Sequence, residues 1–596
     1  MKDIESTYHT LLNGNKQRLK KERKRDNSFV IIRGIFFLGI VAFMIIGYLQ
    51  ELAFLYLYLL PLILIFLILI KKHYRIRNDI TYLQNLITIN TKGLQRLSGH
   101  WVNFSNKGER FIDSDHPYTS DLNIFGHGSL YQYLNATTFY LGEQELASLL
   151  SEESNVREIK LRQEAVKDLA ARFDWRQGFE ATGMNTDKKN HIIKVLLAWV
   201  DEKRIIKNTN NLYILWLVPI ITAVMLILMA FGYVPSYLPL IFIMLQFFIL
   251  IIIQTKTFKV LKGTENASCI LDQFAETLKM IEQETLQAPL LKDIQRRLYV
   301  NGKTASQQVK SLSKITGLLS FRYYILYWVF NALTFSDLYT IIKLNKWKSK
   351  SGKYLNDWLK VIAQLEALSS LAILAHDNPN WVFPEVSDDK PYFKATSLGH
   401  PLIKKEDRVA NDVHLSSTGT ILVITGSNMS GKSTLLRTVG INLTLAYAGA
   451  PVCARSINCP LMNIYTSMRI QDSLEQNISA FYAELNRIKL IIEAAKNGKP
   501  LIFMIDEIFK GTNSQDRILG AKTIIKNLTE YNAIGFVTTH DLELSILEKE
   551  FPDKIKNYNF NDEIINNEIT FNYKLEKGVS KTTNAIALMK MVGIIE

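Results

Sequence analysis

The chain has 596 residues, of which 70 are Lys or Arg and 56 are Asp or Glu, so its formal net charge is +14. This length predicts two to four domains, and the basic balance favours a polyanionic partner, either nucleic acid or an anionic membrane surface. Only three cysteines occur, Cys269, Cys453 and Cys459. Without a CxxC pair or a Cys–His cluster, they exclude a zinc-finger type of domain and indicate buried thiols in a reducing compartment.

Four apolar blocks interrupt the N-terminal half, and each is close to the roughly 20 residues that cross a hydrocarbon core. They span about residues 29–48, 52–70, 212–231 and 234–253. Buried core helices are the alternative, but such helices are usually shorter and carry a polar stripe. We therefore predict two transmembrane hairpins. A cleaved signal peptide fits poorly, because a second block follows the first at once.

Basic residues lie at the open end of each predicted hairpin, whereas the connections inside the hairpins are only two or three residues long. Seven Lys or Arg residues lie between Lys16 and Arg25, and four lie between Lys71 and Arg77. The positive-inside rule then predicts an integral membrane protein, of the bacterial inner-membrane type, with its soluble parts in the cytoplasm. The basic N-terminal run is either a topology signal or a contact for anionic lipid. Arg33, near the start of the first block, is expected to extend toward the headgroups.

The soluble segments differ in pattern. Residues 71–211 and 254–377 show helical patterns. The helical spacing across residues 142–171 is broken near Ser151, and a further helical pattern runs from Asp357 to Ala375. Beyond Asn378, short β-branched runs at 420–425, 501–505 and 533–538 alternate with helical patterns. That alternation predicts an α/β domain with a largely parallel sheet.

The first of these runs ends on a glycine-rich loop with the spacing G-x-x-x-x-G-K-S. The loop consists of Gly426, Ser427, Asn428, Met429, Ser430, Gly431, Lys432, Ser433 and Thr434. Glycines let successive backbone N–H groups face a phosphate, and the helix that follows adds its positive N-terminus. Lys432 supplies a charge to the β and γ phosphates, and the Ser433 hydroxyl is a magnesium ligand. The pattern predicts a site for ATP and Mg²⁺.

Acidic residues at the end of the second run supply what hydrolysis needs. Asp506 follows a wholly apolar strand and is placed to hold magnesium, while Glu507 can orient or deprotonate the attacking water. A solvated loop is the alternative for two adjacent acids, but the apolar strand before them argues against it. His540, at the end of the third run, is placed to sense the γ phosphate. The sequence therefore predicts an ATPase with Glu507 and His540 as catalytic residues.

These motifs resemble those of the MutS mismatch-repair ATPases. Thr425–Arg437 is similar to the family's TGPNMGGKST loop, Asp506–Thr512 to its DEIGRGT segment, and Asn477–Glu484 to its STFMxE signature. Weaker similarity covers two further groups of segments. These are Phe125–Leu130, Leu134–Thr137 and Arg162–Val166 in the helical core, and Asp357–Ala375 and Lys574–Gly593 in the connecting helix and the closing segment.

The resemblance implies an all-α core and lever domain before a P-loop domain of the ABC ATPase type, and a homodimer through the ATPase domains. It implies that Ser479 contacts the γ phosphate held by the partner subunit, and that Arg408 and Tyr573 stack on the adenine. It divides the chain into six parts. They are a basic segment (1–28), a first hairpin (29–70), the first part of the helical domain (71–211), a second hairpin (212–253), the second part with its connector helix (254–377) and the ATPase domain (378–596).

Differences between this chain and the family change the partners that we expect for the chain. The first hairpin stands where the family has its mismatch-reading domain, and the second interrupts the helical domain where the family inserts its DNA clamp. We therefore expect lipid as a partner and, where DNA is bound, non-specific contact through phosphates. The alternative is an ATP-driven transporter or an ABC-type switch unrelated to DNA, although no LSGGQ-like segment precedes Asp506. A non-enzymatic scaffold is disfavoured by Lys432, Asp506, Glu507 and His540.

Overall fold

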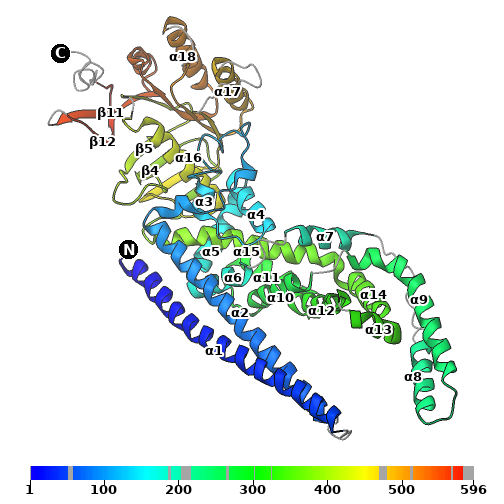
Figure 1. Ribbon diagram of the computed structural model, residues 1–596. Helices are drawn as coiled ribbons and strands as arrows, with labels where there is room; N and C mark the ends of the chain where they lie inside the picture. The colour runs from blue at the N-terminus through cyan, green and yellow to red at the C-terminus, as the bar shows by residue number, and fades with distance from the viewer. Residues whose placement is uncertain are drawn as a thin grey trace.

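The computed structural model describes residues 2–50, 58–184, 190–202, 217–262, 267–300, 302–323, 325–427, 429–468, 480–509, 514–565 and 568–580. Within these ranges the molecule has at one end the α/β domain that is predicted to be an ATPase (the ATPase domain), a helical domain in the middle and two helical arms that point away from the α/β domain (Figure 1).

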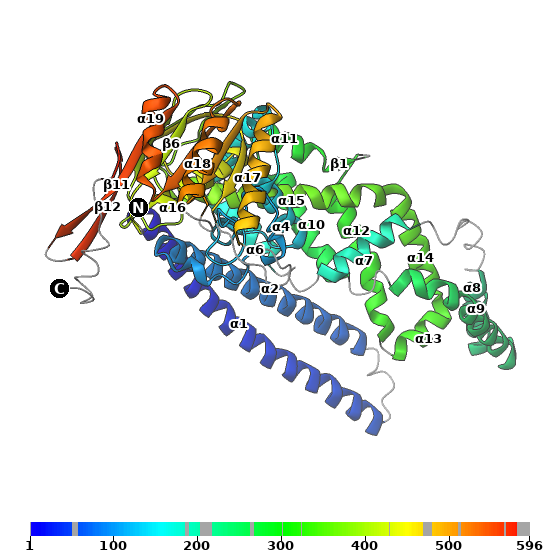
Figure 2. The same cartoon turned by 90° about the horizontal axis from the view of Figure 1, so that it is seen from above.

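The first arm is an antiparallel pair formed by α1 (Lys2–Leu49) and α2 (Leu59–Leu97), which lie side by side along their length (Figures 1 and 2). Three polar side chains hold the pair together near the start of its apolar part. Arg33 Nη1 donates to His73 Nδ1 at 2.6 Å, and His73 Nε2 bonds to Asp26 Oδ1 at 2.7 Å. Arg33 therefore turns toward α2, because His73, which is only 2% exposed, offers it an acceptor inside the hairpin.

The second arm is the helix pair α8 (Leu217–Ala230) and α9 (Tyr237–Lys262). It joins the helical domain beside α13 (Ile325–Thr334) and α14 (Ser336–Trp347), where the buried Phe335 and Leu338 pack with Val218 and Ile249. Gln246, the strongly polar residue of α9, is fully buried against the protein. The apolar helices thus turn their polar side chains inward and their apolar side chains outward.

Short helices surround the middle of the molecule. They are α3 (Leu130–Leu134), α4 (Tyr140–Ser151), α5 (Val156–Ala170), α6 (Phe173–Gly183), α7 (Asn190–Asp201), α10 (Ser268–Gln283), α11 (Pro289–Arg296) and α12 (Ala305–Gly317). A short antiparallel hairpin precedes α12. It consists of β1 (Tyr299–Val300) and β2 (Lys303–Thr304), each two residues long. The break expected near Ser151 is present, since α4 ends there and α5 begins at Val156.

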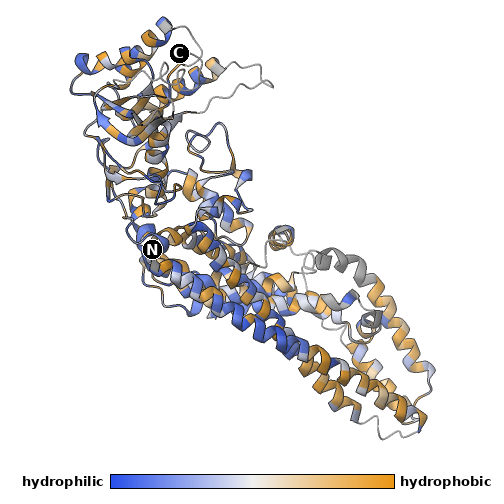
Figure 3. Cartoon of the chain, turned by 60° about the vertical axis from the view of Figure 1, so that its left-hand side comes forward, coloured by the Kyte–Doolittle hydropathy of each residue, from blue (hydrophilic) through white to orange (hydrophobic). Residues whose placement is uncertain are grey.

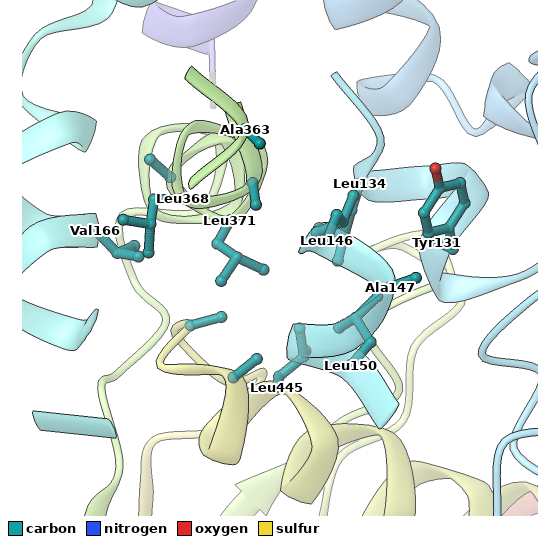
Figure 4. Close-up of a cluster of buried hydrophobic side chains, with 14 of the residues drawn as sticks. Tyr131, Leu134, Leu146, Ala147, Leu150, Val166, Ala363, Leu368, Leu371 and Leu445 are labelled. Carbon is teal, nitrogen blue, oxygen red and sulfur yellow. The ribbon is translucent and has the colours of Figure 1, made fainter. Parts of the chain in front are cut away.

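The connector helix α15 (Lys353–Asp377) runs through the centre of this domain. The basic, Gly- and Ser-containing stretch Lys346–Lys353 predicts a bend before this helix. The structure instead has a π-helical turn at Lys348–Gly352, so the helical path continues from α14 into α15. Figure 4 shows Leu371 of α15 facing Leu150 of α4 and Leu445 of α16. One apolar core therefore continues from the helical domain into the ATPase domain.

Two helical stretches among the described residues are long and apolar enough to cross a membrane. The stretch from Asp3 to Leu49 has only 6% of its most apolar window buried, whereas the stretch from Ser336 to Asp377 has 83% buried. The second stretch is α14 and α15, the core of the helical domain. Two shorter apolar helical segments, Leu217–Ala230 and Tyr237–Ile251, belong to the second arm.

The ATPase domain has a six-stranded sheet in the order β12-β11-β6-β10-β9-β8. Its strands are β6 (Ile421–Thr425), β8 (Asn463–Ser467), β9 (Leu501–Ile505), β10 (Ala533–Thr539), β11 (Ile555–Ile565) and β12 (Glu568–Lys577). All neighbours are parallel except β11 and β12, as the alternating pattern predicts. The three expected strands are β6, β9 and β10. A second sheet, β3-β7-β4-β5, was not predicted; it contains Glu385–Ser387, Ser456–Pro460, Phe393–Leu398 and Asn411–Leu415.

Helices cover both faces of the six-stranded sheet. Leu422 and Ile424 of β6 point into the core shared with α16 (Lys432–Ala448). Ile421 and Val423 point to the opposite core, which contains α17 (Ala480–Lys496) and α18 (Ser514–Leu528). Because both faces are covered, the strands read as continuous apolar runs, and their carboxyl ends meet at one edge. That edge carries the predicted site.

Candidate nucleotide site

The loop between β6 and α16 needs glycine at two places. Gly426 has a φ of +152° and Gly431 a φ of +106°, in the region that disfavours side chains. A Cβ at Gly426 would lie 2.9 Å from Ser430 Oγ, and one at Gly431 would lie 3.2 Å from the ring of Tyr573. The backbone therefore curls tightly between strand and helix. Met429, also at positive φ, is 86% exposed.

Lys432 lies inside this loop and is almost completely buried. Its Nζ donates to the carbonyl oxygens of Gly426 at 2.8 Å and Ser427 at 2.7 Å. The ammonium charge is thus fixed at the mouth of the loop, beside the N-terminus of α16, which favours an anion there. The hydroxyl of Ser430 is buried without a hydrogen-bond partner among the described residues. A donor of this kind fits a phosphate oxygen.

The acidic pair sits where β9 meets β10. The hydroxyl of Thr538 donates to Asp506 Oδ1 at 2.5 Å and accepts the backbone N–H of Glu507 at 3.0 Å. Glu507 has a φ of +54°, a strained conformation for a residue with a side chain. The Thr538 hydroxyl therefore orients the Asp506 carboxylate and supports the unusual backbone conformation that positions the Glu507 carboxylate.

His540 follows β10 and reaches Glu507, with 2.9 Å between His540 Nε2 and Glu507 Oε1. Both side chains are partly accessible to solvent. A carboxylate that is bonded to an imidazole and open to water can hold and reorient a water molecule. The structure thus brings together Glu507 and His540 as the sequence predicts.

These parts meet at a cleft of about 480 Å³. Its lining includes Ser427, Met429, Ser430, Gly431, Lys432, Ser433, Thr434, Glu507 and Tyr573, together with His400 and Asn411. Asn411 fixes the far wall, since its side chain donates to the Tyr573 carbonyl at 3.0 Å and accepts from the Leu575 N–H at 2.9 Å. A volume of this size and polarity suits a nucleotide.

The two residues expected to stack on adenine occupy different places. Tyr573 lines the cleft, with a positive φ of +53°. Arg408 lies behind the lining. Its guanidinium donates to the Ile403 carbonyl at 2.6 Å and to Cys453 Sγ at 3.0 Å, and it lies 5.5 Å from the centre of the Trp381 ring. Asn428 and Ser479 lie outside the described residues, so their roles stay predictions.

Several supporting residues escaped the sequence reasoning. Thr538 was missed because threonine in a strand reads as a simple β-former. Asp562 of β11 accepts from the Ser427 hydroxyl at 2.7 Å and joins the phosphate loop to the sheet edge. Glu484 accepts the N–H of Phe509 at 2.5 Å, behind Glu507. The sequence signal available for Glu484 was its place in the segment that resembles the family's signature, whereas no nearby motif in the sequence points to Asp562.

His400 is a titratable group in the cleft wall. Burial, together with the neighbouring charges of Arg408 and Arg437, lowers the pKa of His400 to about 4. A lowered native pKa means that the unfolded chain binds more protons between pH 4 and about 6.5. The contribution of His400 to stability is therefore complete above about pH 6.5 and is lost as pH falls toward 4.

We predict that replacing this histidine flattens the acid limb of the stability curve. Between pH 6.5 and 4, wild type should lose on the order of 1–3 kcal/mol more than His400→Gln, as measured by chemical unfolding across that range. A matched variant of the exposed His127, His127→Gln, should keep the wild-type profile. Parallel curves for wild type and His400→Gln would contradict the assignment.

Comparison with known proteins agrees with this geometry. The model of "MutS domain V" matches residues 422–596. Proteins named "DNA mismatch repair protein MutS" are similar over the C-terminal part. The one from Phocaeicola vulgatus is 35% identical over 243 residues, which are 39% of this chain and 27% of that protein. Those from Thermotoga maritima and Aquifex pyrophilus are 32% and 34% identical over 241 residues, which are 40% of this chain and 30% and 28% of theirs.

The chain thus covers less than a third of the length of these relatives. The similarity lies in the part that carries the glycine-rich loop, the acidic pair and His540. The comparison therefore shows that the C-terminal part of the chain, residues 422–596, is similar to MutS domain V, a domain with the P-loop ATPase fold.

Proposed function

We propose that this protein is a membrane-anchored MutS-like ATPase that binds and hydrolyses MgATP at sites shared between two chains. The observation that carries the catalytic part is that Lys432 and Glu507 line one cleft, with His540 bonded to Glu507 beside it. The anchoring rests on the exposed apolar arms. The two parts are argued separately because they have separate tests.

The residues present fit a magnesium nucleotide. Lys432 and the loop N–H groups would hold the phosphates, while Ser433 and Asp506 would hold the metal ion. No group of three or more His, Cys, Asp or Glu side chains that could hold a metal occurs among the described residues. That suits Mg²⁺, which keeps several waters and takes only one or two protein ligands beside phosphate oxygens. When bound, the ion neutralises charge that develops on the phosphates.

The chain's own residues would then act on water. Glu507 accepts a hydrogen bond from a water molecule at the open side of its carboxylate and takes up its proton. His540 fixes the other side of that carboxylate through its 2.9 Å contact. Thr538 keeps Asp506 in place, so that Asp506 would hold the metal ion while Glu507 acts on water. Ser479 of a second chain would complete the site, as the resemblance implies.

We predict that Glu507→Gln keeps nucleotide binding but lowers ATP turnover by about 10²- to 10⁴-fold, because the amide cannot accept the proton. Turnover and the affinity for a fluorescent ATP analogue should be measured on detergent-solubilised protein. Glu543→Gln, an exposed acid close by, is the control and should hydrolyse ATP like wild type. An unchanged rate in Glu507→Gln would overturn the catalytic assignment.

The two arms expose more apolar surface than water tolerates. In α1, Ile31 is 61% and Leu38 is 66% exposed; in α9, Met244 is 66% and Phe248 is 62% exposed. Figure 3 shows the apolar parts of both arms at the same end of the molecule, far from the ATPase domain. Contiguous apolar patches of this extent mark contact with a membrane or a partner. Two arms ending at one level fit a single bilayer.

Charged residues support the same placement. Exposed basic side chains occupy α1 between Lys16 and Arg25 and α2 between Lys71 and Arg77, just outside the apolar part. Inside that part, Arg33 donates to His73, which in turn bonds to Asp26. The buried polar groups are thus bonded to one another within the hairpin, and the basic side chains at its open end are exposed, as expected for a hairpin whose open end faces the cytoplasm.

We predict that the hairpin tips cross the membrane. In a Cys269→Ser background, where the remaining Cys453 and Cys459 are buried, single cysteines replace Gln50, Tyr233 and Glu153. Gln50→Cys and Tyr233→Cys should react with a membrane-impermeant maleimide in intact cells. Glu153→Cys, on the exposed surface near the ATPase domain, should react only after lysis. Equal labelling of all three before lysis would contradict the topology.

For DNA, we propose contact through phosphates alone. The relatives are named for mismatch repair, but they match this chain only in its C-terminal part. The exposed basic residues of α1 and α2 offer charge without a base-reading motif. Phosphate contacts depend on salt and not on sequence.

In filter binding, we predict equal affinity for homoduplex and singly mismatched DNA, falling steeply as salt rises from about 50 to 200 mM. The matched comparison is the two duplexes at each salt concentration. A preference for the mismatch above about tenfold at physiological salt would show base readout and contradict the proposal.

A further inference from the structure

Helix α13 of the helical domain turns polar side chains inward and large apolar side chains outward. Tyr327 and Asn331 are buried, whereas Phe330 is 55% and Leu333 is 39% exposed. A helix on the surface of a water-soluble domain has the opposite arrangement. The sequence of α13, Ile325–Thr334, also contains no charged residue. Its outer face therefore suits an apolar medium better than water.

The inward side chains are held by Asp337, near the start of α14. Its Oδ1 accepts from the Tyr327 hydroxyl at 2.6 Å, and its Oδ2 accepts from Asn331 Nδ2 at 3.0 Å. The Asp337 N–H donates to Asn331 Oδ1 at 2.9 Å, and Arg322 Nε lies 3.5 Å from Asp337 Oδ1. Because a buried polar group that loses its partner is costly, α13 cannot turn Phe330 inward without breaking these bonds.

Positive charge lies next to this apolar face, on the exposed side of α14. Tyr339, Lys343 and Lys346 are exposed and follow one another at helical spacings of four and three residues. Lys343 Nζ lies 5.2 Å from the centre of the Tyr339 ring. Apolar side chains, a tyrosine and a row of lysines are together typical of segments that lie in the headgroup region of an anionic membrane.

The two helices form a corner beside the second arm, which we call the α13–α14 corner (Ile325–Trp347). Phe335, in the turn between the helices, and Leu338 pack with Val218 of α8 and Ile249 of α9. Figures 1 and 2 both show α13 between the two arms. The 10 residues of α13 rise by about 15 Å, half of the roughly 30 Å hydrocarbon core. A helix of this length is too short to span a bilayer, but it can lie along the bilayer surface.

We propose that the α13–α14 corner is a third membrane contact, which lies in the headgroup region of the bilayer and binds anionic phospholipid. Phe330 and Leu333 enter the acyl boundary, and Lys343 and Lys346 bind the lipid phosphates. The bilayer is the occupant because the corner adjoins the second arm and because its lysines complement an anionic leaflet. The contact fixes the helical domain against the membrane between the arms. This inference rests on the proposed membrane anchoring.

The first test measures the depth of labelled side chains in full-length protein reconstituted into phospholipid vesicles. In the Cys269→Ser background described above, Phe330→Cys, Leu38→Cys and Glu153→Cys each carry one fluorophore. Lipid with a nitroxide at the headgroup should quench the Phe330 label at least about threefold more than the Glu153 label. Lipid with a nitroxide deep in the acyl chain should quench the Leu38 label most.

The second test asks whether anionic lipid is preferred. Replacing pure phosphatidylcholine with vesicles that contain about 30 mol% phosphatidylglycerol should raise headgroup-level quenching of the Phe330 label about twofold. Lys343→Glu combined with Lys346→Glu should abolish this increase. Lys489→Glu combined with Lys496→Glu is the matched control, because these lysines are exposed on α17 of the ATPase domain, and it should keep the increase.

The outcomes separate this inference from the proposed anchoring. A Phe330 label that aqueous iodide quenches, beside a Leu38 label quenched from within the membrane, overturns this inference and leaves the anchoring intact. A Phe330 label shielded from both iodide and lipid nitroxides assigns the face to a second protein chain and also overturns it. Equal quenching in neutral and anionic vesicles overturns the binding of anionic lipid. A Leu38 label in water refutes the anchoring, and this inference with it.

Discussion

The burial of α15 is the constraint on which the molecule depends. Leu371 and its neighbours on this helix contact α4 on one side and α16 on the other, so the helical domain and the ATPase domain share one apolar core (Figure 4). Cores of this density change arrangement in discrete steps and do not deform smoothly. A shift of α16, the helix that starts at Lys432, therefore cannot occur without repacking against the helical domain. The position of the helix that begins at Lys432 is therefore tied to the helical domain by packing.

Much of this architecture could be predicted because its signals are local. The runs at β6, β9 and β10 are fully buried and rich in apolar residues, many of them β-branched, as expected for strands covered on both faces. The sheet β3-β7-β4-β5 was missed because its strands have only 3–6 residues and join distant segments, β3 pairing with β7 some 70 positions later. The expected bend at Lys346–Lys353 became a π-helical turn, because α14 and α15 are both held in the core.

The same distinction applies to the site. Lys432, Asp506, Glu507 and His540 are marked by neighbours in sequence, and the structure places Lys432 and Glu507 in the cleft lining, with His540 bonded to Glu507 and Asp506 held by Thr538 beside them. The residues that hold these groups in position can be recognised only in the three-dimensional structure. Thr538 supports the positive φ of Glu507, which costs of order 1–3 kcal/mol without such support. The sequence identifies the candidate catalytic groups, whereas long-range hydrogen bonds decide their geometry.

The first arm shows how such contacts extend beyond the ATPase domain. Tyr8, near the start of α1, donates to Asp377 Oδ1 at 2.8 Å at the end of α15, and its ring packs on Gly93 of α2. His376 stacks on Phe173 beside it, with 3.9 Å between ring centres. From this contact α1 continues without a break to Leu49, a length of about 62 Å at 1.5 Å per residue. A rotation of about 5° at Tyr8 would displace the far end of the arm by roughly 5 Å. Since Tyr8 binds the last residue of the helix that joins the two domains, the arm is placed to respond to any movement there.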